Sequence, residues 1–438
     1  MTQHNDVVII GGGWAGLAAA LELDAHNIPV SLYESAPQLG GRARNAPFGD
    51  FSVDNGQHLL IGAYREILRL LTMIGVEESE VLLRTQLCLK VVEGNETLLI
   101  QPPALPAPLH LAWAQLTARG LSMGERLRAL LMSLQLMLSK FTLVNDISVA
   151  ELLQQHRQGD IIVRRFWEPL CIATLNTPID KASAQVFLRV LRDSFTQHRH
   201  DADLLIPKEP LGDLFPQRAA TFLQRSNNHV QLRQRGEALH IVEDQLEAIT
   251  ISNKRIPCHD AIIATAPHAA ERLLSGHIAL NSIREQLSAL GNQPITTIYL
   301  QYPAAHQLEE PMLGMSGTLT QWLFDRRHCG QPGLIAVVIS AEGEHQAWDS
   351  NTLTSHVLQE INRQFPHWPQ PLDSRVINEK RATFECHVGI EAQRPSNTTP
   401  VKGLWLAGDY TDTSYPATLE GAVRSGVECA HRIIEQRH

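Results

Sequence analysis

The chain has 438 residues, of which 44% are hydrophobic and 19% charged, so it can form two or three domains with sizeable cores. The net charge is −9 and no cluster of Lys and Arg is present, which argues against a nucleic-acid partner. The six cysteines are far apart and form no C-x-x-C pair, so neither a metal site nor a disulfide framework is predicted, and a reduced, cytoplasmic location is favoured. We expect no signal peptide, and no apolar run approaches the ~18–20 residues of a membrane-spanning helix.

The chain opens with a predicted βαβ unit that binds a dinucleotide. Residues 7–10 are a short apolar run typical of a buried strand, and a glycine-rich turn at 11–16 leads into a run of helix formers. A second strand, residues 28–33, ends at an acid that can accept hydrogen bonds from a ribose and disfavours the 2′-phosphate of NADP. The glycines permit a tight turn and a close approach to pyrophosphate, which the helix N-terminus attracts. The predicted contacts are Gly11, Gly13, Trp14, Ala15, Gly16, Glu34 and Ser35.

A second glycine-rich segment follows directly and favours a flavin over NAD. Gly40 and Gly41 let the backbone pass close to a ligand, while Arg42 and Arg44 can reach phosphate or flavin edges. This segment resembles the one that follows the acid in the flavoprotein superfamily of amine oxidases, protoporphyrinogen oxidases and carotenoid desaturases. The resemblance implies FAD as cofactor.

The middle of the chain changes character twice. Residues 64–200 are predicted to be mostly helical, with helices at 64–74, 121–143, 148–155, 162–173 and 182–194. Strands are predicted at 230–232, 239–242, 246–251 and 261–264, the last returning the chain to the nucleotide domain. Further β-rich stretches at 296–302 and 334–340 would form the floor of a substrate cavity. No second G-x-G-x-x-G is present, which argues against a separate NAD(P)H domain.

The C-terminal end supplies a second part of the same cradle. A predicted strand at 403–407 ends in Gly408 and Asp409, and a loop rich in Thr and Ser leads to a helix that begins near residue 417. Asp409 can accept from ribityl hydroxyls, and the helix N-terminus at Thr418 and Leu419 can stabilise negative charge on a reduced flavin. The same flavoprotein superfamily ends in this pattern.

These observations predict an α/β fold with a discontinuous Rossmann-like FAD-binding domain and an inserted α+β substrate domain. The FAD-binding domain would comprise residues 1–63, 207–272 and 395–438, and the substrate domain residues 64–206 and 273–394.

Composition gives a first indication of the substrate. Residues 126–141 are strongly apolar with basic ends, so they form either a core helix or, alternatively, the wall of a lipid tunnel or a helix at the membrane interface. The Pro-rich residues 102–109 could rim such an entrance. Aromatic residues make up only 5% of the chain, which fits an aliphatic, isoprenoid-type substrate better than an aromatic amine.

Three local segments are similar to the squalene-associated FAD-dependent desaturases: residues 54–64, residues 166–170 with 173–178, and residues 408–411 with 415–421. This resemblance adds Gly56, Gln57 and His58 to the expected cofactor contacts. Members of that family act in hopanoid biosynthesis, so the reaction implied is reductive removal of the hydroxyl from hydroxysqualene, which gives squalene and water.

Such a reaction needs a general acid to protonate the leaving hydroxyl and a dry cavity to protect the allylic cation. The candidates within the matching segments are Glu168, His58, Asp54 and Tyr415. A buried Glu168 would have a raised pKa, as an acid requires, whereas Asp54 could instead brace the preceding Arg-rich loop.

Two alternatives remain at this stage. The same scaffold serves oxidative carotenoid-type desaturases and amine oxidases, and proteins that escort prenylated GTPases resemble the fold without binding flavin. A homodimer and a peripheral location on the inner face of the cell membrane are further expectations, and the electron donor is unidentified.

Overall fold

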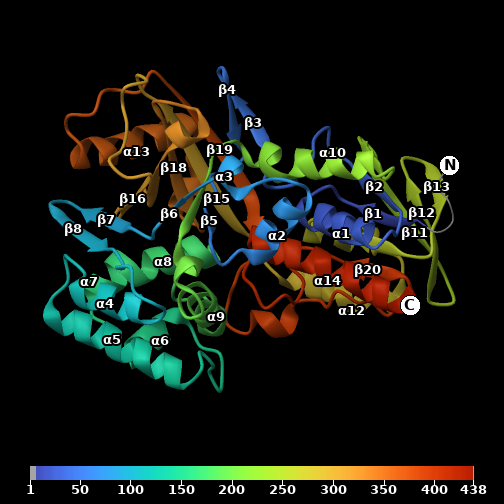
Figure 1. The fold of residues 1–438 in the computed structure, drawn as a ribbon, viewed down its shortest axis with the longest axis horizontal. Helices are drawn as coiled ribbons and strands as arrows, with labels where there is room; N and C mark the ends of the chain where they lie inside the picture. The colour runs from blue at the N-terminus through green and yellow to red at the C-terminus, as the bar shows by residue number, and fades with distance from the viewer. Residues whose placement is uncertain (1–5, 438) are drawn as a thin grey trace.

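The computed structural model describes residues 6–437. A five-stranded parallel sheet forms one end of the molecule, in the order β10 (His229–Leu232), β2 (Val30–Glu34), β1 (Val7–Ile10), β14 (Ala261–Ile263) and β20 (Leu404–Leu406) (Figure 1). The strand predicted to return the chain is confirmed, because β14 pairs with both β1 and β20. Strands that are more than 390 residues apart in the sequence therefore end at the same sheet edge.

The first and last helices of the chain pack directly against each other. These are α1 (Trp14–Ala25) and α14 (Leu419–Arg437), shown in blue and red in Figure 1. A Cβ atom at Gly426 would lie 2.1 Å from the backbone oxygen of Ala15, so the close crossing requires a glycine. Ten residues of α1 are buried, which explains why its sequence is apolar on all sides.

A seven-stranded sheet forms the centre of the other half, in the order β19 (Asp373–Thr383), β15 (Gln293–Gln301), β18 (Leu334–Ser340), β17 (Trp322–Asp325), β16 (Met312–Met315), β7 (Leu89–Glu93) and β8 (Glu96–Ile100). Its pairings are antiparallel except that of β16 with β7. Helix α13 (Ser350–Gln364) contributes Leu353, Val357 and Ile361 to a core shared with this sheet.

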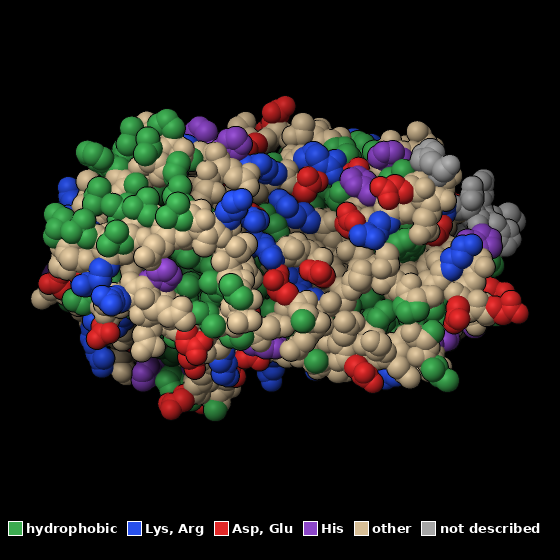
Figure 2. Space-filling view, turned by 90° about the horizontal axis from the view of Figure 1, so that it is seen from below, with side chains coloured by type: hydrophobic (Ala, Val, Ile, Leu, Met, Phe, Trp, Pro, Cys, Tyr) green, Lys and Arg blue, Asp and Glu red, His purple; other side chains and the backbone are tan. Residues whose placement is uncertain are grey.

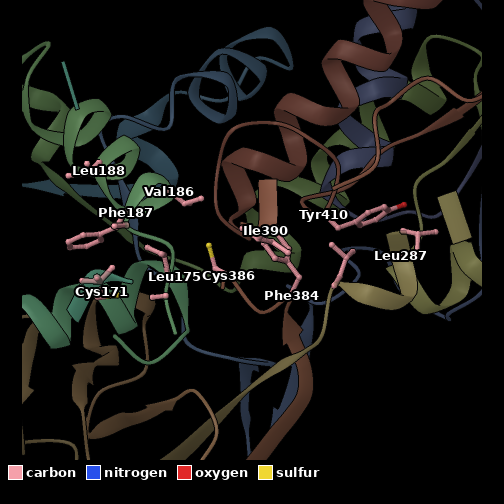
Figure 3. Close-up of a cluster of buried hydrophobic side chains, with 14 of the residues drawn as sticks. Cys171, Leu175, Val186, Phe187, Leu188, Leu287, Phe384, Cys386, Ile390 and Tyr410 are labelled. Carbon is pink, nitrogen blue, oxygen red and sulfur yellow. The ribbon is translucent and has the colours of Figure 1, made fainter. Parts of the chain in front are cut away.

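A helical lobe lies beside the β7–β8 end of the sheet (Figure 1). Its helices are α4 (Leu109–Thr117), α5 (Met123–Leu138), α6 (Val149–Gln155), α7 (Asp160–Ile162), α8 (Glu168–Leu175) and α9 (Ala184–Phe195), with a π-helical turn at Val163–Trp167 before α8. Figure 3 shows side chains of α8 and α9 beside Cys386, Phe384 and Ile390 from the segment after β19. These contacts join the lobe to the rest of the molecule.

The remaining elements connect these parts. Three-stranded sheets are formed by β11 (Gly236–Val242), β12 (Gln245–Ile251) and β13 (Lys254–Pro257), and by β5 (Leu60–Ile61), β9 (Leu204–Pro207) and β6 (Leu82–Thr85). A hairpin pairs β3 (Asn45–Phe48) with β4 (Phe51–Asp54). The other helices are α2 (Arg65–Met73), α3 (Glu78–Val81), α10 (Arg218–Arg225), α11 (Pro267–Leu273) and α12 (Asn281–Ala289).

The sequence-based elements differ from the structure in three places. Residues 82–100, within the stretch predicted to be mostly helical, form β6, β7 and β8. The helix predicted to reach residue 143 ends at Leu138, and Lys140 and Phe141 adopt left-handed backbone angles. The helix predicted from 162 is interrupted by the π-helical turn. Strand β7 pairs with β16, more than 200 residues away, so local periodicity carries little of its signal.

The predicted α/β architecture is confirmed, with the parallel sheet formed by segments from both ends of the chain. The exact division into two domains stays a prediction. Helix α2, which opens the segment assigned to the substrate domain, packs on α14, and the Glu420 carboxylate accepts from the backbone N–H groups of Glu66 and Ile67. Within residues 6–437, no helix combines the length and the apolar character needed to cross a bilayer.

Candidate active site

A cavity of about 1290 Å³ lies between the carboxyl ends of the parallel strands and the seven-stranded sheet. Its lining combines the glycine-rich turns of both chain ends with side chains from the helical lobe and from β15 to β18. All of the residues predicted to hold the cofactor line it except Gly16.

The first turn is built as a close-packed cradle. Gly11 has a φ of +116°, and a Cβ there would lie 2.4 Å from the backbone oxygen of Ala264, which directly follows the neighbouring strand β14. A Cβ at Gly16 would lie 2.0 Å from the Gly11 oxygen, so this glycine lets α1 approach the turn instead of facing the cavity. Gly13, by contrast, has only the Cα of Gly41 nearby, at 3.9 Å. The surface that this turn presents to the cavity at Gly13 is therefore backbone without a side chain.

Glu34 closes the turn at the end of β2. Its two carboxylate oxygens accept from the backbone N–H groups of Gly12 and Ala36, each at 2.7 Å. The side chain is almost buried, yet it lines the cavity. The acid therefore holds the glycine turn in place, and its role toward a ribose stays a prediction.

An ion pair joins the two ends of the chain across the cavity. The guanidinium of Arg42 donates to the carboxylate of Asp409 at 2.5 Å and to the backbone oxygen of Ala382 at 2.7 Å. Arg42 comes from the second glycine segment and Asp409 directly follows β20 and Gly408. The two motifs therefore form one site, as a single bound flavin requires.

The cradle fits a flavin dinucleotide. No side chain caps the N-terminus of α1, which leaves its first N–H groups available to phosphate. Trp14 Nε1 and Thr265 Oγ1 are buried polar atoms that have no hydrogen-bond partner among the described residues, and both residues line the cavity. Buried polar atoms of this kind are normally paired, so a bound ligand would satisfy them.

Asp54 lies behind the cavity wall, in a buried ion pair. Its carboxylate accepts from Arg326 at 2.7 Å and from the backbone N–H of Leu211 at 2.6 Å, and both charged side chains are 1% exposed. Arg326 also donates to Gln57 Oε1 at 2.6 Å. Asp54 thus braces the segment that leads to His58, and it is not among the described residues that line the cavity.

His58 and Tyr415 both line the cavity, although His58 lies near the start of the sequence and Tyr415 near its end. Burial lowers the pKa of His58, so its imidazole is neutral near pH 7. Burial raises the pKa of Tyr415, which keeps its hydroxyl protonated, while the guanidinium of Arg424, 4.3 Å from the ring centroid, acts in the opposite direction. Sequence reasoning missed Asp193 of α9, which also lines the cavity and raises the pKa of Tyr415 further.

The structure does not bring Glu168 together with these groups. Its pKa is raised, as expected, by burial and by the nearby charge of Asp180. However, Leu170, Ala173 and Thr174 of the same helix line the cavity, whereas Glu168 is not among its described lining residues.

The part of the cavity away from the glycine turns is predominantly apolar. Its walls come from α8, α9 and the seven-stranded sheet with the residues just before β7. They include Leu87, Leu89, Leu170, Val190, Ile295, Met312, Phe324 and Val338. Trp322 contributes a buried indole N–H without a hydrogen-bond partner among the described residues. The stretch 334–340, expected to form part of the cavity floor, contributes Val338 and Ser340 of β18, whereas β15 contributes Ile295, one residue before the predicted stretch 296–302.

Residues 14–434 match the model of the family described as flavin containing amine oxidoreductase. The chain belongs to this family. FAD as the cofactor of this flavoprotein is thereby confirmed, as is its nature as an oxidoreductase.

Individual relatives narrow the comparison for this flavoprotein. It is 26% identical to a hydroxysqualene dehydroxylase of Sinorhizobium fredii, with 97% of each chain covered. It is also 26% identical to a 15-cis-phytoene desaturase of an Oncidium hybrid cultivar, with 98% of this chain and 78% of that one covered. A solved structure of a putrescine oxidase triple mutant superposes with a TM-score of 0.78 at 14% identity, over 99% of each chain. The resemblance to squalene-associated enzymes is confirmed, and the chain is similar to enzymes named for isoprenoid substrates.

Proposed function

We propose that this flavoprotein removes the hydroxyl group of hydroxysqualene by reduction, which yields squalene and water. The observation that carries the proposal is the composition of one cavity: a flavin cradle at one end continues into walls of Leu, Ile, Val, Met and Phe side chains at the other. Such walls suit a long aliphatic chain and offer few partners to a polar or charged substrate. The full-length similarity to hydroxysqualene dehydroxylases supports the same substrate.

Loss of the hydroxyl requires a proton on the leaving oxygen. Of the four candidate acids, His58 and Tyr415 line the cavity. Tyr415 lines the cavity with its hydroxyl protonated, and Arg424, 4.3 Å from the ring centroid, favours the phenolate that remains once the proton has left, which opposes the rise in pKa that burial causes. We therefore assign the proton donor to Tyr415, with His58 as a neutral hydrogen-bonding group.

The carbon–oxygen bond breaks as water departs with this proton, and the allylic carbon gains a hydride equivalent. FAD, once bound and reduced, supplies that hydride. The apolar walls exclude water that would otherwise recapture the cation. In this proposal Tyr415 supplies the proton, His58 donates or accepts a hydrogen bond, and the apolar walls bind the substrate and exclude water.

A single-turnover experiment tests the proposed reaction. Photoreduced enzyme is mixed with hydroxysqualene without oxygen, and flavin absorbance and products are followed together. We expect the flavin to be reoxidised while squalene forms in a one-to-one ratio. A reduced flavin that stays reduced with hydroxysqualene, together with an oxidised enzyme that desaturates squalene or phytoene, would instead favour an oxidative desaturase.

The proton donor is tested by Tyr415→Phe, which removes only the hydroxyl. Because general acids typically contribute 10²–10⁴-fold, we expect a decrease of about 100-fold in the single-turnover rate with FAD content unchanged. Tyr302→Phe is the matched control, since Tyr302 is fully buried but lies in an aromatic cluster with His306 and Trp368 and is not among the described cavity residues. An unchanged rate for Tyr415→Phe would move the assignment to His58.

A further inference from the structure

Helices α4 and α5 carry a continuous face of exposed large hydrophobic side chains. On α5 the exposed residues recur every three or four positions, and the exposed fraction reaches 58% at Leu131 and 85% at Leu138. On α4, Leu109 and Trp113 are 60% and 54% exposed. Figure 2 shows hydrophobic side chains gathered at this end of the molecule. We call this surface the apolar face, and it comprises Leu109, Trp113, Met123, Leu127, Leu131, Leu134 and Leu138.

The apolar face is not the side of α5 that faces the protein core. The opposite side of the helix, with Ala129, Met132 and Leu136, is buried in the lobe. The two helices are held together by contacts that include a hydrogen bond of 2.8 Å from Gln115 Nε2 to Ser133 Oγ. Helix α5 is therefore apolar on two sides, and one of them faces outward. A contiguous exposed surface of this kind indicates a binding partner.

The exposed charged side chains on α4, α5 and the segment between them are positive. Residues 109–140, which include α4, α5 and the segment between them, contain four Lys or Arg residues and one acid, Glu125, while Glu96 and Asp146 lie outside this stretch. Glu125 is buried and its carboxylate accepts from the backbone N–H and the hydroxyl of Ser122, at the start of α5. Arg119, Arg128 and Lys140 are exposed. The segment therefore presents positive charge to its surroundings.

We propose that the apolar face docks on a lipid bilayer that contains anionic lipids. The Leu, Met and Trp side chains would enter the boundary between headgroups and acyl chains, and the basic side chains would contact the anionic headgroups. A second copy of the chain is a poorer partner, because two such faces would bring like charges together.

The apolar face lies close to the apolar part of the cavity. Strand β8 leads into α4 and pairs with β7, whose Leu89 lines the apolar part of the cavity. Leu170 of α8 and Val190 of α9, in the same helical lobe, also line the cavity, so the lobe that would contact the lipid forms part of the cavity wall. That the bilayer delivers the substrate rests on the proposed function, whereas the docking itself depends only on the surface.

Flotation of the FAD-loaded protein with vesicles tests the docking. One set of vesicles contains phosphatidylcholine alone, and the other contains phosphatidylcholine with an equal amount of phosphatidylglycerol. We expect binding to the anionic vesicles, weakened by added NaCl, and little binding to the neutral ones. Leu138→Glu should lower the binding to anionic vesicles by about 10-fold or more, since one fully exposed Leu side chain no longer enters the lipid.

Ile278→Glu is the matched control, because Ile278 is 88% exposed but lies on a 3₁₀ turn outside the apolar face. It should bind as the unaltered protein does. Equal binding of both variants, or no binding of the unaltered protein to anionic vesicles, would overturn the proposal. So would a dimer in analytical ultracentrifugation that Leu138→Glu dissociates. Flavin content and turnover of detergent-dispersed substrate are measured in parallel, so a failure of docking is separated from a failure of the proposed reaction.

Discussion

The two halves of the cavity are built in different ways. The cofactor half is made of backbone: glycine turns at the carboxyl ends of β1, β2 and β20, held by short contacts such as that of Glu34 with the N–H of Gly12. The substrate half is made of side chains that come from α8, α9 and strands of the seven-stranded sheet. The first half depends on where glycines and one acid stand in the sequence, and the second on how distant segments pack.

This difference predicts that substitutions should separate into distinct classes. A change in the glycine turns should release the cofactor and spare the fold, whereas a change in the apolar walls should weaken substrate binding and spare the cofactor. The ion pair of Asp54 and Arg326 lies where the two halves meet, since it braces the segment that carries Gln57 and His58.

The largest expected effect is that of Arg326→Met. The substitution leaves the Asp54 carboxylate buried without a cation, and the loss of one partner of a buried ion pair typically costs about 3–5 kcal/mol. Urea denaturation should show this decrease in the free energy of unfolding, with weaker FAD and substrate binding as a consequence. The double variant Asp54→Asn with Arg326→Met should lose less than the sum of the two single changes. Additive losses would contradict a direct coupling.

Gly11→Val should distort the glycine turn of the cofactor half and leave the apolar walls of the substrate half unchanged. The new side chain would sit at a φ of +116° with its Cβ 2.4 Å from the Ala264 oxygen. Strain of about 1–3 kcal/mol at such a position corresponds to a loss of up to about 100-fold in FAD affinity. The ratio of flavin to protein absorbance measures this. Gly124→Ala on α5, where an added Cβ has only Arg128 within 4 Å, at 3.9 Å, should retain its flavin.

Phe324→Ala should weaken substrate binding without affecting the bound flavin. The loss of one large apolar side chain from the wall is expected to raise the KM for hydroxysqualene by about 10-fold while the flavin stays bound. Steady-state kinetics with detergent-dispersed substrate provide the measurement. Phe365→Ala, in the aromatic stack with Trp368 and not among the described cavity residues, should lower stability without this change in KM.

The smallest effect is expected for Glu168→Gln, in neither half. Because folding raises the pKa of Glu168 above 4.5, its contribution to stability is full below pH 4.5 and is lost as the pH rises through the raised value. The glutamine variant should therefore melt slightly higher than the unaltered protein at pH 8 but not at pH 4, with solvent screening keeping the gain below about 1 kcal/mol. A fall in turnover as large as that of Tyr415→Phe would instead show that Glu168 reaches the substrate.

The sequence by itself determined the cofactor half. The turn at Gly11, the acid at Glu34 and the Gly408–Asp409 pair are each defined by a few neighbouring residues, because tight turns and strand ends impose local requirements on residue type. The α/β fold followed from the same motifs, because a βαβ unit at the start of the chain and a strand, loop and helix at its end predict strands of one parallel sheet.

Only the tertiary structure decided the rest. Periodicity marked α5 as apolar but could not tell that one of its faces stays uncovered, since that depends on what packs against it. The sequence offered four candidate proton donors in the matching segments. The fold placed Tyr415 and His58 on the cavity wall and buried Asp54 against Arg326, whereas Glu168 is not among the described cavity residues. Asp193 carried no motif at all, because its place beside Tyr415 arises from the packing of two elements more than 200 residues apart.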